Sequence, residues 1–380
     1  MLDMRRDLHR HPELSFEETH TAALIEAELK AAGLENVQNN VGGVHGVMAT
    51  LRGGKPGKTL LVRADIDGLP IQEQNQVNYR SETAGVMHAC GHDGHIAIAV
   101  TLAQALAATR DELPGTIKFA FQPAEERGSG AMPMLNAGIL NDPEVEAVLG
   151  LHLWNNLPAG QLGVCNGPIF AGVSSVDITV KGRGGHGALP HQTIDALLVG
   201  TAIVGALQTI VSREIAPDQS AVVTVGSFHA GSASNIISPE AKLSLSLRST
   251  TAQANDYLLS RVQEIADGVA HAMRAECEFV VREGIPPVVN NPRIADAVRR
   301  AGRTAIGPAN VVEVKTTTVS DDMAYFLEAK PGCYFLMGSG TTSHGNLTAF
   351  PHHHPRFDLD ESCLAPAVEV FANAIMELNQ

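Results

Sequence analysis

The chain has 380 residues, of which 44% are hydrophobic and only 4% aromatic, and its formal net charge is −14 at pH 7. A chain of this length can bury a sizeable core and favours two domains over one. The negative charge and the lack of a basic stripe argue against a nucleic-acid-binding protein, so we expect no nucleic-acid partner.

The cysteines and the N-terminal residues indicate the compartment. The first residues lack the apolar run of a signal peptide, and no later stretch reaches the length that we expect of a membrane span. We therefore predict a cytoplasmic protein without a membrane partner. Five cysteines are spread widely, without the spacing of a disulfide framework, and all but the first are expected to be small core residues: Cys90, Cys165, Cys277, Cys333 and Cys363.

The first part of the chain alternates helices and strands. Apolar residues at helical spacing predict helices over about 3–32, ending at Gly33, and over 96–108. Short apolar runs bounded by turn residues predict four strands, over 46–51, 59–64, 115–121 and 144–151.

Polar side chains follow three of these predicted strands. Asp65 and Asp67 come after the second strand, Glu125 and Glu126 after the third, and the fourth is expected to end at His152. In open α/β sheets, ligands bind outside the carboxyl ends of the strands. Each pair of acids alone could be a solvated turn, but together the three strand ends favour one site that gathers carboxylates and an imidazole.

The segment Met-His-Ala-Cys-Gly-His-Asp-Gly-His, residues 87–95, places a thiol and three imidazoles in one turn. Thiolate sulfur and imidazole nitrogen are the usual ligands of zinc and its neighbours, and Gly91 and Gly94 allow the backbone to bend. Alone, this segment could be a surface turn around an inert buried cysteine. The carboxylates at the strand ends favour a metal site, and the histidine triplet 352–354 could add a ligand or form an exposed polar loop.

From about residue 173 the pattern changes to strand, helix, strand, strand, helix, strand, which is the ferredoxin-like order. Glycine and proline flank this segment at both ends. We predict a catalytic domain in two parts, 1–172 and 286–380, with an inserted domain at 173–285. The elements expected in the insertion are strands over 174–181, 221–228, 241–248 and 276–281 and helices over 195–213 and 252–273, and those after it are a helix over 293–305 and a strand over 333–338.

Five sequence blocks together resemble the M20 metallopeptidase family, in particular its amidohydrolase branch of N-acyl-amino-acid, hippurate and auxin-conjugate hydrolases. The resemblance covers nearly the full length of the chain. It implies an α/β fold: a zinc-peptidase-like α/β catalytic domain with an inserted ferredoxin-like α+β domain that serves as lid and dimerisation domain. The blocks are Leu-His-Arg-His-Pro-Glu-Leu (8–14), Arg-Ala-Asp-Ile-Asp-Gly-Leu-Pro (63–70), His-Ala-Cys-Gly-His-Asp-Gly-His (88–95), Phe-Gln-Pro-Ala-Glu-Glu (121–126) and Gly-Gly-His-Gly-Ala-Leu-Pro-His (184–191).

The resemblance implies two divalent metal ions per subunit, with zinc as our first choice and manganese, cobalt or nickel as alternatives. Cys90 would bridge the two ions. The triplet contributes His353 by the family's pattern, while His352 and His354 remain alternatives. The full set of implied ligands is Cys90, His92, Glu126, His152 and His353.

The resemblance also implies the residues that act on the substrate, a small N-acyl-L-amino acid hydrolysed to a carboxylic acid and a free amino acid. Glu125 would be the general base. In a homodimer formed through the inserted domain, His186 would reach the partner's active site and help to stabilise the oxyanion, while Asn235 and Arg248 would hold the substrate carboxylate.

Two other functions remain open at this point: a dipeptidase or carboxypeptidase of the same superfamily, and a non-catalytic metal-binding dimer. The chain also departs from the family's pattern at two places. The block 320–323, Ser-Asp-Asp-Met, stands where Glu-Asp-Phe is common, and Gly68 stands where alanine is more usual.

Overall fold

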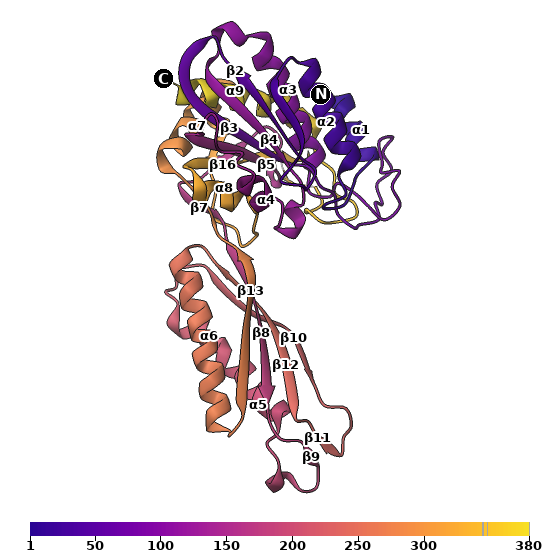
Figure 1. Cartoon of the computed structure of the whole chain (residues 1–380), viewed down its shortest axis with the longest axis vertical. Coiled ribbons are helices and arrows are strands. Elements are labelled where there is room, and N and C mark those ends of the chain that lie inside the picture. The colour runs from indigo at the N-terminus through magenta and orange to yellow at the C-terminus, as the bar shows by residue number, and fades with distance from the viewer. Residues whose placement is uncertain (344–345, 348, 380) are drawn as a thin grey trace. The chain divides into compact units, whose positions relative to one another are not determined.

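The computed structural model describes residues 1–343, 346–347 and 349–379. The chain divides into two compact units (Figure 1): unit 1 consists of Met1–Ile169, Val288–Lys315 and Asp321–Gln380, and unit 2 of Phe170–Pro287 and Thr316–Ser320. Unit 2 is therefore one long insertion into unit 1, together with a short later segment.

Unit 1 is built on a mixed eight-stranded sheet. The central strands β4, β3, β5 and β16 run parallel to one another, whereas β1, β2 and β6 each have an antiparallel neighbour. Parallel strands joined by helices confirm the predicted α/β class. The strands in spatial order are β1 (Glu35–Val41), β2 (Gly46–Arg52), β4 (Pro114–Gln122), β3 (Lys55–Asp65), β5 (Ala147–Pro158), β16 (Gly332–Gly340), β6 (Leu162–Val164) and β15 (Val311–Glu313).

The side chains of this sheet alternate between an apolar face and a more polar one. On the apolar face, β3, β4, β5 and β16 form a large core with α2 (Thr19–Ala31), α3 (His92–Ala108), α7 (Pro292–Ile306) and α9 (Leu364–Leu378). Because neighbouring residues point to opposite faces, the same strands present buried polar side chains on the other face: Arg63, Asp65, Gln122, His152 and Tyr334.

The remaining elements of unit 1 are short. Helix α8 (Met323–Ala329) packs against β5 and β16. A Cβ on Gly150 would lie 2.9 Å from the Tyr334 ring and 3.0 Å from the Met323 side chain, so glycine leaves room for both. The described elements are α1 (Leu2–Arg10), α4 (Ala131–Asn136), α8 (Met323–Ala329) and the two-stranded pairs β7 (Gly167–Phe170) with β14 (Val288–Asn290) and β17 (Thr342–Ser343) with β18 (Asn346–Leu347).

Three features of unit 1 differ from the sequence-based expectations. Helix α3 begins at His92 rather than at residue 96, directly after Gly91, whose φ of 90° glycine adopts without strain. Several elements were not predicted, of which β1 is the longest strand and α9 the longest helix. The fourth predicted strand does not end at His152, because β5 continues to Pro158 by pairing with β16. Its pairing with β3 stops at Gly150, so His152 still lies just beyond that ladder.

Unit 2 has the ferredoxin-like order of elements. Its four strands form an antiparallel sheet in the order β10-β12-β8-β13, and the two helices pack on it around a separate apolar core. The elements are β8 (Gly172–Lys181), α5 (Ala196–Thr209), β10 (Ala221–Ala230), β12 (Glu240–Ser249), α6 (Ala252–Ala272) and β13 (Glu276–Ile285), with a small pair formed by β9 (Gly185–His186) and β11 (Ile236–Ile237).

One helical segment corrects the expectation about membrane spans. Residues Ala196–Glu214, which comprise α5 and a π-helical turn, are long and apolar enough to cross a membrane. However, Val199, Ile203 and Leu207 on this helix are buried in the core of unit 2. Only 33% of its most apolar stretch is buried, so one face of the segment packs on the sheet of unit 2 and the rest is exposed.

Candidate metal centre and active site

The structure brings the five predicted metal ligands together in unit 1. Cys90 Sγ lies 3.5 Å from His152 Nε2, and Glu126 Oε2 lies 3.3 Å from His353 Nε2. The ligand atoms of Cys90, His92 and His152 lie within 4.8 Å of one another, and so do those of Cys90, Glu126 and His353. Cys90 belongs to both groups, which is the position that a bridging ligand requires.

His92 is held with one ring nitrogen turned toward this cluster. Its Nδ1 lies 2.9 Å from the backbone oxygen of Asp67, so Nδ1–H donates to that oxygen and Nε2 is left as the acceptor. Nε2 lies 3.9 Å from a carboxylate oxygen of Glu125 and 3.9 Å from one of Glu126. The ring is therefore oriented for metal binding by a neighbour outside the ligand set.

His152 and His353 are positioned by backbone contacts. His152 Nδ1 lies 2.6 Å from the backbone oxygen of Leu153, which again directs Nε2 toward Cys90. The backbone N–H of His353 donates to the oxygen of Ala89 at 2.8 Å, so the late loop is attached to the residue before Cys90. His353 has a φ of 64°, an uncommon backbone conformation for a residue with a side chain, and such outliers are frequent at functional sites.

The other two histidines of the triplet have different neighbours. His352 stacks on Trp154 and its Nε2 lies 2.9 Å from the backbone oxygen of Leu153. His354 stacks on Phe350. These contacts favour His353 as the ligand from the triplet.

The loop that carries Glu125 and Glu126 is fixed by three carboxylates from three other parts of unit 1. Glu18 accepts the N–H of Ala124 at 2.9 Å. Asp67 accepts the N–H groups of both glutamates, at 3.2 and 3.1 Å. Further along the loop, Asp322 accepts the N–H groups of residues 130 and 131, at 3.2 and 3.1 Å. We call Glu18, Asp67 and Asp322 the carboxylate clamp.

A buried ion-pair network holds Asp322, one of the three residues of the clamp. The Arg63 guanidinium is fully buried and contacts Asp65 at 2.7 Å, Asp321 at 3.3 Å and Asp322 at 2.9 Å. Gln122 also donates to both oxygens of Asp322, at 2.8 and 2.9 Å. Because these charges are desolvated, each one depends on its partners to remain buried.

The residues of the cluster fit a pair of divalent cations. His92 Nε2 and Glu126 Oε1 are buried and have no hydrogen-bond partner within the described part of the chain. Burial raises the pKa of Cys90 well above its ordinary value, and the charges of Glu126 and Glu125 raise it further. A site with crowded carboxylates and a buried thiol lacks positive charge, and cations bound to those donors would supply it.

Glu125 lies beside the ligands and has the environment of a proton acceptor. Burial raises its pKa well above the ordinary value for glutamate, and the negative charges of Asp321 and Glu126 add to this effect. Such a shift makes this carboxylate a stronger proton acceptor than an ordinary glutamate. Both glutamates lie 3.9 Å from His92 Nε2, and Glu126 also faces His353.

The predicted substrate-binding residues lie in unit 2. His186 pairs with Ile236 across the small sheet of β9 and β11, and the N–H of the next residue, Gly187, donates to the backbone oxygen of Asn235. Arg248 lies elsewhere, near the end of β12, where it pairs with Val173 and donates to the oxygen of Thr318 at 2.7 Å. The structure brings His186 and Asn235 together, but not Arg248.

The β9–β11 pair lies at one end of the unit 2 sheet (Figure 1), and Arg248 lies near the other end of β12. Strand β12 starts at Glu240 beside Lys181, next to the β9–β11 pair, and Arg248 comes eight residues later. At 3.2–3.4 Å per residue, this separation is about 25 Å. Within one chain, these groups are too far apart to hold one small carboxylate.

Several supporting residues were not predicted as site residues. The Asp-x-Asp signal at residues 65–67 suggested a site, but not that Asp67 holds the glutamate loop. Glu18 and Asp322 gave no such signal, because one lies at the start of a surface helix and the other in a block of unclear role. His95, the third imidazole of the Cys90 segment, contacts Asp65 through Nδ1 at 2.5 Å and accepts the N–H of residue 153 through Nε2.

Comparison with known proteins agrees with this geometry. The sequence model of peptidase family M20/M25/M40 matches residues 61–377. An N-acetylcysteine deacetylase of Bacillus subtilis is 37% identical over 98% of this chain and 95% of its own length. Thermostable carboxypeptidase 2 of Saccharolobus solfataricus is 36% identical over 96% of this chain and 91% of its own length.

A solved structure shares the whole architecture. The Bacillus subtilis YXEP protein, described as a dinuclear metal binding peptidase from the M20 family, superimposes with a TM-score of 0.86 at 34% identity. The match covers 99% of this chain and 97% of the YXEP chain.

Proposed function

Because the chain belongs to peptidase family M20/M25/M40, we propose that it hydrolyses the amide bond of N-acyl-L-amino acids with two divalent metal ions. The relatives that are named deacetylases and carboxypeptidases support metal-dependent hydrolysis of amides. The N-acyl-amino-acid substrate, of the hippurate type or a related conjugate, is our more specific proposal, as is a location in the cytoplasm.

One observation carries the proposal most strongly. Cys90, His92, Glu126, His152 and His353 converge on one another, with a further carboxylate, Glu125, beside them. A purely structural metal site needs no such extra carboxylate, since its ligands complete the coordination. The arrangement therefore favours an enzyme over the non-catalytic alternative.

The five ligands would hold the two ions, with Cys90 between them. When bound, such ions polarise a carbonyl group and make water acidic enough to act as a nucleophile near neutrality. The dinuclear relative supports two ions per chain, and zinc is our first choice because its usual ligands are sulfur, imidazole and carboxylate.

Glu125 would move the proton in both halves of the reaction. It would take a proton from the attacking water and then deliver it to the leaving amine, so that no free amide anion is released. The carboxylate clamp holds the backbone of Glu125 in place. The position of Glu125 is therefore set before the substrate binds. His186 would donate a hydrogen bond to the tetrahedral oxyanion.

The 25 Å separation within unit 2 supports a dimeric active site. Arg248 could bind the substrate carboxylate through its planar guanidinium, while His186 and Asn235 would come from the other subunit. One substrate could then contact all three residues. We accordingly propose a homodimer formed through unit 2.

The Glu125→Gln variant tests the role of the base. It should retain wild-type metal content, because glutamine removes only a group outside the ligand set, and lose activity by at least two orders of magnitude, the range typical of acid–base catalysis. Metal analysis and turnover of N-acetyl, N-benzoyl and N-indoleacetyl amino acids are the measurements. Near-normal turnover would refute the assignment.

The Cys90→Ser variant tests the bridging ligand. Serine has nearly the same size but is a much weaker donor, so metal content after dialysis should fall by one or both ions per chain, and activity should fall with it. Cys333→Ser is the control, because Cys333 is also fully buried but lies in the apolar core. Unchanged metal content in Cys90→Ser would remove Cys90 from the ligand set.

Carboxypeptidase activity is the second candidate, favoured by the 36% identity with the archaeal carboxypeptidase. Both activities use the same centre and differ in whether the substrate carries a free amino group. Comparing N-acylated amino acids with unblocked dipeptides on the metal-loaded protein separates them. A preference for the dipeptides would favour the second candidate.

A further inference from the structure

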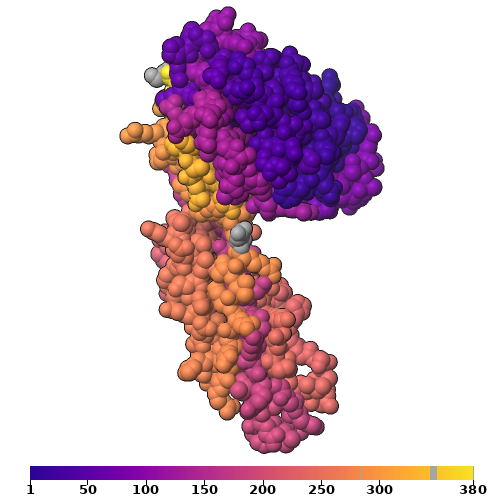
Figure 2. Space-filling model, viewed as in Figure 1, coloured from indigo at the N-terminus to yellow at the C-terminus, as the bar shows by residue number. Residues whose placement is uncertain are grey.

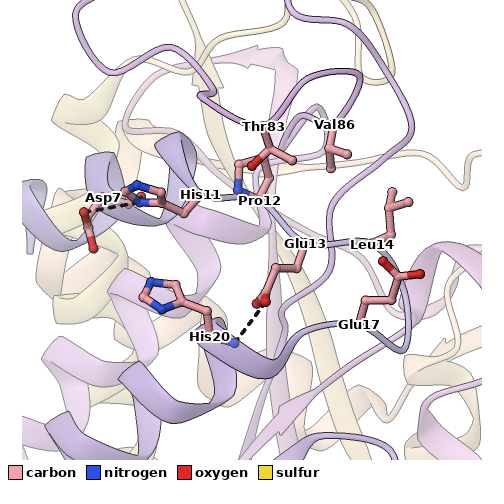
Figure 3. A pocket seen from close by; sticks show the side chains of 9 residues that line it. All are labelled: Asp7, His11, Pro12, Glu13, Leu14, Glu17, His20, Thr83 and Val86. Carbon is pink, nitrogen blue, oxygen red and sulfur yellow. Dashed lines mark hydrogen bonds and ion pairs between the residues drawn. The ribbon is translucent and has the colours of Figure 1, made fainter.

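A second group of potential metal ligands lies on the surface of unit 1, in the N-terminal part of the chain. A cavity of about 480 Å³ opens there between the end of α1, the start of α2 and the loop around Thr83 (Figure 3). Residues of this N-terminal part are coloured indigo in Figure 2 and form part of the exposed surface of unit 1. Asp7, His11 and His20 line the cavity.

These three side chains place their donor atoms close together. One ligand atom from each lies within 4.8 Å of those from the other two. His11 Nδ1 is 3.5 Å from Asp7 Oδ1, and the His11 and His20 rings lie edge to face with centroids 5.8 Å apart. Ligand bonds to zinc are about 2.0–2.2 Å long, so only small side-chain rotations are needed for one ion to contact all three.

Local structure holds both histidines near this arrangement. Asp7 and His11 are one helical turn apart at the end of α1, and His11 Nδ1 lies 3.0 Å from the Asp7 backbone oxygen. The neutral ring can carry its proton on Nε2 instead, and the Nδ1 lone pair, on the atom that lies 3.5 Å from Asp7 Oδ1, is then available to a metal ion. On the other side, the Glu13 carboxylate accepts the N–H groups of His20 and Thr21, at 3.0 and 2.8 Å, and so fixes the first turn of α2.

The charges around the cavity favour a cation. Glu13 and Glu17 also line it, and Glu82 Oε2 lies 3.9 Å from His11 Nε2, so it adds negative charge beside the ring. One competing positive group is present, because Arg10 lies 3.9 Å from Asp7. Both of these side chains are partly exposed, so solvent screens their interaction and it is weak.

We propose that Asp7, His11 and His20 bind one additional divalent cation of the class that prefers imidazole, such as Zn²⁺, Cu²⁺ or Ni²⁺. Two imidazoles and one carboxylate suit these ions, whereas Ca²⁺ and Mg²⁺ prefer sites made of oxygen ligands. Water would complete the coordination from the open side of the cavity. The site shares no residue with the proposed catalytic centre, so the two proposals stand or fall separately.

Zinc stoichiometry of the full-length protein is the first test. Wild type and His20→Ala are dialysed against the same micromolar free Zn²⁺ and analysed for bound metal, with His271→Ala as the control because His271 is an exposed histidine on α6. The His20→Ala protein should bind one Zn²⁺ fewer per chain than wild type and the control. Equal zinc content in all three proteins would overturn the proposal.

The ligands themselves are tested with one equivalent of Cu²⁺ added to zinc-loaded protein, which should displace Zn²⁺ from this open surface site because Cu²⁺ binds such ligands more tightly. Electron paramagnetic resonance of the wild type should show hyperfine coupling to two ring nitrogens, and His11→Ala and His20→Ala should each lose one of them. Unchanged spectra in both variants would refute the site. Amide hydrolysis by His20→Ala should equal that of the wild type, so a result here is distinguishable from a failure of the catalytic proposal.

Discussion

At the scale of single residues, the candidate centre is supported by buried charged groups whose pKa values and stability depend on the partners that each one has. Glu18 illustrates this dependence. Its carboxylate accepts the N–H of Ala124, but its second oxygen is buried without a hydrogen-bond partner in the described chain. Burial raises the pKa of Glu18 to about 7, so at neutral pH the folded protein carries a carboxylate that is only partly ionised.

This shift predicts a pH-dependent stability. The unfolded state releases the Glu18 proton near pH 4.5 and the folded state near pH 7, so stability contributed by the protonated form is present below about pH 4.5 and is lost as the pH rises through about 7. The Glu18→Gln variant has no proton to lose in this range, so its stability should not fall with pH for this reason. Its side-chain oxygen can still accept the N–H of Ala124. At about pH 8 the variant should be more stable than wild type by up to about 3 kcal/mol, at 1.36 kcal/mol per pKa unit.

Urea unfolding at about pH 5 and pH 8 measures the difference. Glu17→Gln is the matched control, because Glu17 is the exposed neighbour in the sequence and should leave the pH dependence of the wild type unchanged. If Glu18→Gln shows the same fall in stability between the two pH values as wild type, another group is responsible.

At the scale of elements, the glutamate loop is held by groups from outside it rather than by its own secondary structure. It contains only a short 3-10 turn, Glu125–Arg127. Asp322, at the start of α8, joins the far end of the loop to the buried Arg63. Gly130 is also needed here, because a Cβ at this position would lie 1.6 Å from the backbone oxygen of Pro123.

The Asp322→Ala variant should therefore be strongly destabilised. It leaves the buried Arg63 with fewer partners and frees the N–H groups of residues 130 and 131, and breaking a buried pair costs about 3–5 kcal/mol. Asp65 and Asp321 still contact Arg63, which favours the lower end of that range. Denaturant unfolding measures the loss, and metal content should fall as the loop loosens.

A control on the same helix separates this effect from a general weakening of α8. Glu328 is exposed, so Glu328→Ala should change stability by no more than about 0.5 kcal/mol. A loss of similar size in both variants would mean that Asp322 has no special role in holding the loop.

At the scale of the whole molecule, the proposed active site needs two chains. The separation of Arg248 from His186 and Asn235 by about 25 Å means that no single copy of unit 2 can present all three to one substrate. A dimer solves this problem, because one copy can supply Arg248 and the other copy can supply the remaining pair.

Mixing two inactive variants tests this arrangement. His186→Ala and Glu125→Gln proteins are unfolded together and refolded, which produces mixed dimers. If His186 acts in the partner's site, each mixed dimer has one intact site, and random pairing should restore about a quarter of the wild-type activity. Each variant treated alone is the control. No recovery in the mixture, with dimers present, would show that His186 does not act across subunits.

The sequence by itself determined the fold class, the family and the candidate ligands. Periodicity is a local property, so most of the long helices and strands could be predicted from neighbouring residues, although β1 and α9 were not. The side chains at 90–92 and 125–126 also predicted metal binding directly, since thiol, imidazole and carboxylate are the groups that bind such ions. Strand β5 continues beyond His152, but its pairing with β3 ends at Gly150. His152 therefore lies at the edge of the parallel pair, as the prediction of a site at the strand ends requires.

Only the tertiary structure decided which residues support those ligands and which groups can meet. Glu18 and Asp322 are 304 residues apart in the sequence, from position 18 to 322, yet both bind backbone N–H groups of one loop. Likewise, the length of β12 separates Asn235 from Arg248 and excludes a shared role within one chain. Such contacts depend on the packing of distant segments, and no local pattern of residues specifies that packing.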